Sequence, residues 1–138
     1  MRRYTSKTWR YKKVTKSIVA GIIALALVVS CGIVEVVVLR NRYEELHAQC
    51  LEVMELAREE KLSAHEFDAF RDKWVELRET SELFLPHQDV YEMNLRFAES
   101  EAYVEQNDYE QLLAQLSVIE ELLQYVPHLM TPNFNHLI

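Results

Sequence analysis

The sequence has few of the residues that make turns, with two glycines and three prolines among 138 residues. Strand-like alternation of apolar and polar residues is also hard to find after Leu39. Glycine and proline end regular elements and supply the tight turns between strands, so a chain with so few of them has few, long elements. The sequence therefore predicts an all-α fold.

Cysteine is also scarce, with only Cys31 and Cys50 in the chain. The two positions lie about five turns apart on one predicted helix, and a disulfide cannot bridge that distance within one chain. This excludes an intrachain disulfide. We expect Cys50 to be a small buried apolar residue, although a thiol outside the cytoplasm could instead pair between chains.

Motifs for common chemistries are missing as well. The sequence has no glycine-rich phosphate loop, no His-Glu-x-x-His pair and no cysteine pair at zinc spacing. One Glu-x-x-His motif, Glu44 to His47, is present, whereas a di-iron bundle needs two of them and two further glutamates. We therefore expect a protein that is not an enzyme and has no catalytic residues, no cofactor and no metal site.

What the chain does have is one long apolar stretch, Ser17 to Leu39, in which Glu35 is the single charge. A helix of this length reaches roughly 35 Å, enough to cross a hydrocarbon core. Residues 1–16 carry seven Lys or Arg and no acid, whereas residues 40–138 have a net charge of −13. Because basic flanks stay in the cytoplasm, we predict a cell-membrane protein with three parts: a basic cytoplasmic leader (1–16), a transmembrane helix (17–39) and an acidic extracytoplasmic domain (40–138).

The basic leader also contains aromatic residues, Tyr4, Trp9 and Tyr11. Cations and such aromatics favour the headgroup region of a membrane. We therefore expect membrane lipid, and no nucleic acid, as the partner of the leader.

The apolar stretch can also be read as a signal peptide. Val28, Val29 and Ser30 before Cys31 have the form of a lipoprotein cleavage site, which would leave Cys31 as a lipidated N-terminus. The residues that follow Cys31 stay apolar to Leu39, where a lipoprotein normally turns polar. An uncleaved anchor is the preferred interpretation, and lipidation of Cys31 is the alternative.

A stripe of small and slightly polar residues runs along one face of the predicted transmembrane helix. Spacings of four and three place these residues together: Ser17, Gly21, Ala24, Val28, Cys31 and Glu35. In lipid, small residues allow close approach of helices and a carboxylate seeks a partner. We predict that this contact face binds an integral membrane protein or a second copy of the chain, while simple exposure of Glu35 at the membrane interface stays open.

Four helical segments are predicted after residue 40. The first, Asn41 to Lys61, continues the transmembrane helix, because no breaker separates them. A capping box at Ser63 and Glu66 opens the second, the third starts near Gln88, and Asn107-Asp108 caps a fourth that ends before Pro127. Short connections favour an up-down-up-down antiparallel bundle of about four helices.

Apolar residues at helical spacing define the inward faces of this bundle. The predicted inward residues are Leu46, Cys50, Val53 and Ala57; Phe67, Phe70, Trp74, Leu77, Ser81 and Phe84; Val90, Met93, Phe97, Ala98 and Val104; and Leu112, Leu113, Leu116, Ile119, Leu123 and Val126. The C-terminal tail is expected to dock on the bundle through Leu129, Met130, Phe134, Leu137 and Ile138.

The whole pattern resembles a family of small bacterial membrane-anchored proteins, domain of unknown function 4363. The features that carry the resemblance are the basic leader, the late glutamate in the apolar stretch, Trp74, Pro86-His87-Gln88-Asp89-Val90, Tyr103, Asp108 and Val126-Pro127-His128. The resemblance implies the same architecture and a bacterial cell-membrane location. We expect an accessory subunit of another membrane protein, the alternative being an anchored module that binds a small ligand or cation.

Overall fold

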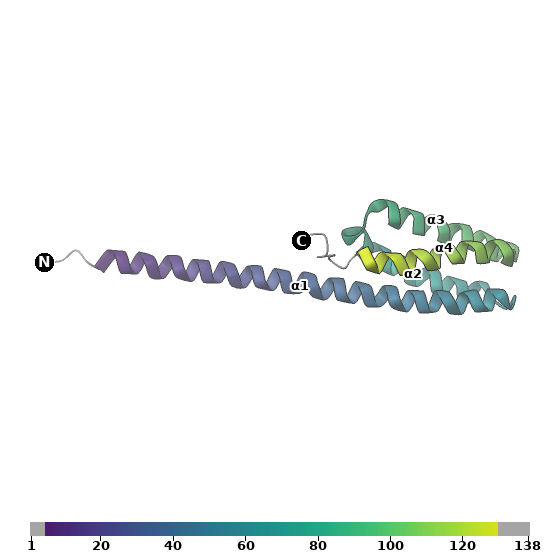
Figure 1. Ribbon diagram of the computed structural model, residues 1–138, viewed down its shortest axis with the longest axis horizontal. Helices are drawn as coiled ribbons and strands as arrows, with labels where there is room; N and C mark the ends of the chain where they lie inside the picture. Colours follow the sequence, from purple (N-terminus) through teal and green to yellow (C-terminus); the bar gives the residue numbers. More distant parts are fainter. Residues whose placement is uncertain (1–4, 130–138) are drawn as a thin grey trace, which may run out of the picture. The chain divides into compact units, whose positions relative to one another are not determined.

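A computed structural model describes the backbone of residues 5–129 and the side chains of residues 14–128, which form four helices and no strand. The helices are α1 (Thr5–Arg58), α2 (Ala64–Phe84), α3 (His87–Gln106) and α4 (Tyr109–Leu129) (Figure 1). The chain divides into two compact units, Met1–Val37 and Val38–Ile138. The all-α prediction is confirmed.

Two helix boundaries have the caps that the sequence predicts. At the start of α2, the Ser63 hydroxyl accepts the Glu66 N–H at 3.3 Å, and the Glu66 carboxylate accepts the Ser63 N–H at 2.9 Å. Between α3 and α4, Asn107 is left-handed with a φ of 53°, and the Asp108 carboxylate accepts the Gln111 N–H at 3.2 Å. Both predicted caps are therefore confirmed.

The hydrogen bonds from Ser63 also hold the pKa of Glu66 below its ordinary value.

Ser63→Ala is expected to lower the free energy of unfolding by about 1 kcal/mol, because the first turn of α2 loses its cap. Chemical unfolding of the full chain in detergent, followed by circular dichroism, measures the difference. Ser117→Ala is the matched control, since this exposed hydroxyl only donates to the Leu113 carbonyl within α4. Equal midpoints for the two variants would contradict the capping role.

In the second unit, α2, α3 and α4 lie beside the C-terminal part of α1, and consecutive helices run antiparallel (Figure 1). Each neighbouring pair is joined by a side-chain hydrogen bond that sets its register. These bonds are Tyr43 to Ser81 at 2.8 Å, Trp74 to Asn94 at 2.8 Å and Arg96 to Gln115 at 3.0 Å. The predicted antiparallel bundle is confirmed.

The core of the bundle is built around aromatic rings from α1, α2 and α3. The Trp74 ring stacks on Phe97 with 5.8 Å between centroids, and it meets Tyr43 edge-on at 6.5 Å. Phe70 also packs on Phe97, at 4.9 Å. Leucines and Ile119 of α4 close the other side, with Leu112, Leu116 and Ile119 fully buried. Most of the predicted inward residues are therefore core residues.

Some residues that the sequence predicts to face inward are exposed or only partly buried. Phe84 is 39% exposed, because α2 ends there and the next residue, Leu85, takes the buried place in an extended conformation. Ala98 is exposed, because α3 turns its 90, 93, 97 and 100 positions inward and Ala98 lies about 100° away from Phe97. Val104 and Leu113 are only partly buried against the core.

The end of α4 also differs from the prediction. The helix continues through Pro127 to Leu129 instead of ending before Pro127. A proline in the last turn leaves one carbonyl without its N–H partner, but its fixed φ is helical, so the turn can form. The tail residues predicted to dock, Met130, Phe134, Leu137 and Ile138, lie outside the described residues, and so does the side chain of Leu129.

Leu39 and Tyr43 belong to the core, although the sequence analysis did not place them there. Both side chains are 1% exposed. The Ser81 hydroxyl donates to the Leu77 carbonyl at 2.8 Å, so the Tyr43 hydroxyl is the donor in its bond to Ser81. The buried core of the second unit therefore begins at the last residue of the apolar stretch.

Candidate functional site

The first unit contains most of the apolar stretch, which lies on α1 and continues two residues beyond Val37. Among residues 5–129, α1 is the one helix long and apolar enough to cross a membrane. Its large apolar side chains are exposed, as for Ile22 at 62% and Val28 at 70%. A core helix of a soluble protein buries such side chains, whereas a membrane segment or a signal sequence exposes them.

The predicted contact face is a continuous surface of α1. Residues 17–35 are helical throughout, so the spacings of four and three put the six predicted residues on one side. All six are exposed, including Cys31, the alternative lipidation site. Nothing among the described residues covers this face, and its role in helix contact stays a prediction.

Gly21 is the second residue of the contact face, one turn after Ser17. A Cβ atom at this position would meet nothing within 4 Å in the described part of the chain. The packing of the chain itself therefore does not require glycine here. A close approach of another helix would require it, because a missing side chain lets two backbones come near each other.

Glu35 ends the contact face and is the single charge between residues 17 and 39. Its side chain is exposed and forms no hydrogen bond or ion pair with the side chains that the structure describes. The carboxylate is therefore available to a group outside the chain.

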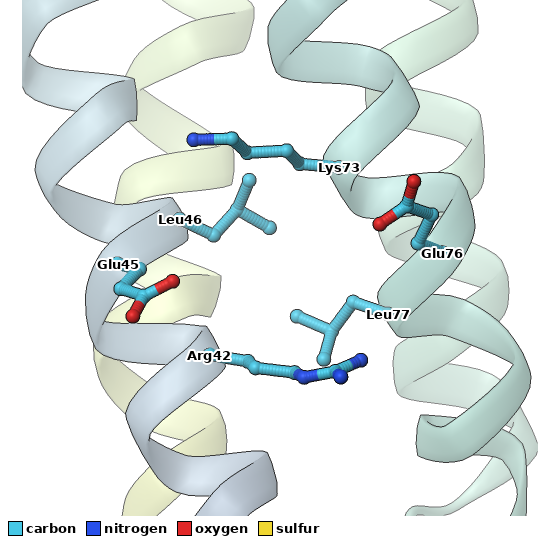
Figure 2. A pocket seen from close by; sticks show the side chains of 6 residues that line it. All are labelled: Arg42, Glu45, Leu46, Lys73, Glu76 and Leu77. Carbon is cyan, nitrogen blue, oxygen red and sulfur yellow. The ribbon is translucent and has the colours of Figure 1, made fainter.

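The second unit has a groove between α1 and α2, with a volume of about 250 Å³ (Figure 2). The lining residues are Arg42, Glu45 and Leu46 from α1, and Lys73, Glu76 and Leu77 from α2. Leu46 and Leu77 are each 2% exposed. None of the four charged side chains forms an ion pair within residues 14–128.

This groove was not predicted from the sequence. Each helix contributes one acid and one base, three residues apart. That spacing shows that the two charges share a helix side, but it does not show which side faces another helix. Only the register between α1 and α2 brings the four charges together.

The Glu-x-x-His motif does not form a ligand pair. Glu44 accepts a hydrogen bond from Arg40 at 3.2 Å, whereas His47 donates to Glu120 of α4 at 3.0 Å. In the described part of the chain, no three His, Cys, Asp or Glu side chains come together as a metal site. The His47–Glu120 contact instead ties α1 to α4.

Cys50 is free and fully buried next to α4. Its thiol donates to the Leu116 carbonyl at 3.8 Å. Burial and, to a smaller extent, the Glu120 carboxylate together raise the pKa of Cys50 to about 12. Because the thiolate is the reactive form, Cys50 is an inert core thiol at neutral pH.

An exposed apolar helix together with a well-packed four-helix bundle defines a small all-α protein with an N-terminal apolar segment. The family described as "Domain of unknown function (DUF4363)" matches residues 35–137, and the chain belongs to this family. The match begins at Glu35 and includes the C-terminal part of α1 and all of α2, α3 and α4. Searches of curated proteins and of solved structures found no match.

Proposed function

We propose that this protein is a non-catalytic, single-pass membrane protein that serves as an accessory subunit of another integral membrane protein. The observation that carries the proposal is Glu35, an exposed carboxylate on a face of small residues in an apolar helix, with no partner among the side chains of residues 14–128. Self-association through the same face is the second form of this contact.

The cost of Glu35 in lipid supports a partner. Placing an ionisable side chain within a membrane helix costs about 3 kcal/mol at the helix centre, and less towards its ends. A hydrogen bond or ion pair from a neighbouring helix offsets this cost. The small residues at 17, 21 and 24 would let the neighbour come close enough.

The distribution of charge supports the orientation. The seven cations of residues 1–16 favour a cytoplasmic leader, and the net charge of −13 over residues 40–138 favours a bundle on the other side of the membrane. We therefore propose that the bundle is extracytoplasmic and that the accessory role also uses its surface.

Crosslinking inside the membrane tests the contact face. With a photoreactive amino acid at position 35, we expect a discrete crosslinked product in intact cells, because this side would lie against a partner helix. The matched control is position 33, which has an exposed apolar side chain on the opposite side of α1. Mass spectrometry of the product identifies the partner, and a product of twice the chain mass indicates self-association. Equal yields from positions 33 and 35 would contradict the proposal.

The alternative function, an anchored module for a small ligand or cation, is favoured by one observation. The groove between α1 and α2 has an apolar floor and is lined by two cations and two carboxylates, none of which forms an ion pair with the side chains that the structure describes. This mixed lining suits a zwitterion better than a simple cation, because the two basic groups would repel the cation. We prefer the accessory role, since exposed charges on helix exteriors are most simply solvated.

A further inference from the structure

The connection between α2 and α3 lies at the end of the bundle where the second unit begins. Tyr43 contacts Ser81 at 2.8 Å, and α1 and α2 run antiparallel. One turn before Tyr43 is Leu39, and one turn after Ser81 is Leu85, so these two buried residues lie at the same level. The α2–α3 connection is therefore level with the end of the apolar stretch.

The C-terminal end of α4 reaches the same level. His47 contacts Glu120 at 3.0 Å, and α4 runs antiparallel to α1. Five residues back from His47 is Arg42, and five residues on from Glu120 is Tyr125. Tyr125 therefore lies level with Arg42, three residues after the apolar stretch.

This end of the bundle exposes apolar surface that its own core does not use. Leu83 is 79% exposed, the largest value for a large apolar side chain among residues 14–128. Phe84 is 39% exposed and Tyr125 is 54% exposed. These three residues lie at one end of the bundle, two on α2 and one on α4, and we call them the proximal patch. One acid near it, Glu82, lies 3.9 Å from Arg78, which offsets its charge.

We propose that the proximal patch is a second membrane contact, in which Leu83 and Phe84 insert among the lipid headgroups and Tyr125 lies at the interface. The proposal rests on the membrane anchoring of the proposed function. Apolar side chains on a polar scaffold bind in this way, and tyrosine favours the interface because its ring is apolar and its hydroxyl is wet.

We assign lipid as the partner of the proximal patch because no residues separate the apolar stretch from the first core residue of the bundle. Leu39 is both the last residue of the stretch and a core residue at 1% exposure, so no linker separates the two parts of the sequence. The end of the bundle that contains Leu39 is therefore the end joined directly to the stretch, and so the end nearest the headgroups wherever the stretch spans a bilayer. Arg42, which has no ion pair among the described residues, adds a cation at this level for anionic lipid.

Fluorescence of the full chain in vesicles tests the contact. The vesicles contain a zwitterionic lipid with a minor share of phosphatidylglycerol, and a polarity-sensitive dye is attached to a cysteine introduced as Leu83→Cys in a Cys31→Ser background. Cys50 is fully buried and stays unlabelled in the folded protein. We expect blue-shifted emission and strong quenching by spin-labelled lipid.

Leu51→Cys in the same background is the matched control, because Leu51 is also an exposed leucine, at 47%, but lies about 18 Å further along α1 than Leu39. It carries the same dye, so the affinity of the dye for lipid is matched. The native chain labelled at Cys31 reports whether the apolar stretch is in the bilayer. Quenching at 83 and at Cys31, with water-like emission at 51, supports the proposal.

Two results would overturn it in distinguishable ways. If the dye at Cys31 is quenched while position 83 behaves like position 51, the anchor stands and the second contact fails. If the dye at Cys31 is not quenched, the anchor fails, and the proposed function fails with it. Protection of position 83 only after a second membrane protein is added would also overturn the lipid contact, in favour of a protein contact.

Discussion

Trp74→Ala is expected to lower the free energy of unfolding of the bundle by about 4 kcal/mol, the largest effect of any single truncation in this core. The side chain is 2% exposed and packs on both Phe97 and Tyr43. Its indole N–H donates to the Asn94 side-chain oxygen at 2.8 Å, so truncation also removes one hydrogen bond between α2 and α3. Urea unfolding of the full chain, followed by circular dichroism, measures the loss.

Two further variants separate packing from the hydrogen bond. Trp74→Phe keeps an aromatic ring against Phe97 and removes the donor to Asn94, and it should cost about 1 to 2 kcal/mol. Val75→Ala changes the adjacent side chain, which is 41% exposed, and should change stability by less than about 1 kcal/mol. A Trp74→Ala loss no larger than that of Val75→Ala would contradict the placement of Trp74 in the core.

The second large effect is a loss of stability in alkali. Burial raises the pKa of Cys50 from 9.0 to about 12, and it raises the pKa of Tyr43 from 10.0 to about 12, where Asp89 adds to the shift and the bond to Ser81 opposes it. Both groups are acids that the fold keeps neutral. The contribution of these groups to stability is therefore fully present below their pKa values in the unfolded chain. It is lost as the pH rises through their pKa values in the folded chain.

One pKa unit corresponds to about 1.4 kcal/mol, so ionisation of the thiol should remove about 4 kcal/mol and that of the phenol about 3 kcal/mol. The loss should start near pH 9 and continue to about pH 12. Unfolding midpoints in urea, measured between pH 7 and pH 11, give the profile. Cys50→Ala should be less stable than the parent at pH 7 but should lose less stability between pH 9 and pH 11.

Cys31→Ser is the control for this profile, because Cys31 is exposed and lies in the other unit. It should show the alkaline loss of the parent. If Cys50→Ala loses as much stability as the parent over this pH range, the buried thiol does not contribute to the alkaline transition.

The sequence predicted the parts of the fold that depend on local pattern. The inward residues from Leu46 to Ala57 and the capping box at Ser63 each depend on spacings of three or four residues within one helix, and both are confirmed. Leu39 and Tyr43 were missed because the apolar stretch continues into the core, and periodicity does not mark a boundary inside a continuous apolar run.

The candidate sites also differ in whether a local pattern is enough to predict them. The contact face is a property of one helix, so its residues could be selected from spacing alone, although what covers it could not. The groove and the proximal patch depend on how helices from distant parts of the sequence line up. That register comes from pairs such as Tyr43 with Ser81 and His47 with Glu120, which are 38 and 73 residues apart.

The short connections of the bundle bear on how it folds. Each helix packs against the next one in sequence, and the connections are as short as Leu85-Pro86. The pair α1 and α4 is in contact although these helices are far apart in the sequence. Helical proteins dominated by contacts between sequence neighbours have low contact order and fold rapidly, since little chain entropy is lost before contacts form. In the proposed topology the bundle crosses the membrane as an unfolded chain, and fast folding would then bury its apolar faces soon after they emerge.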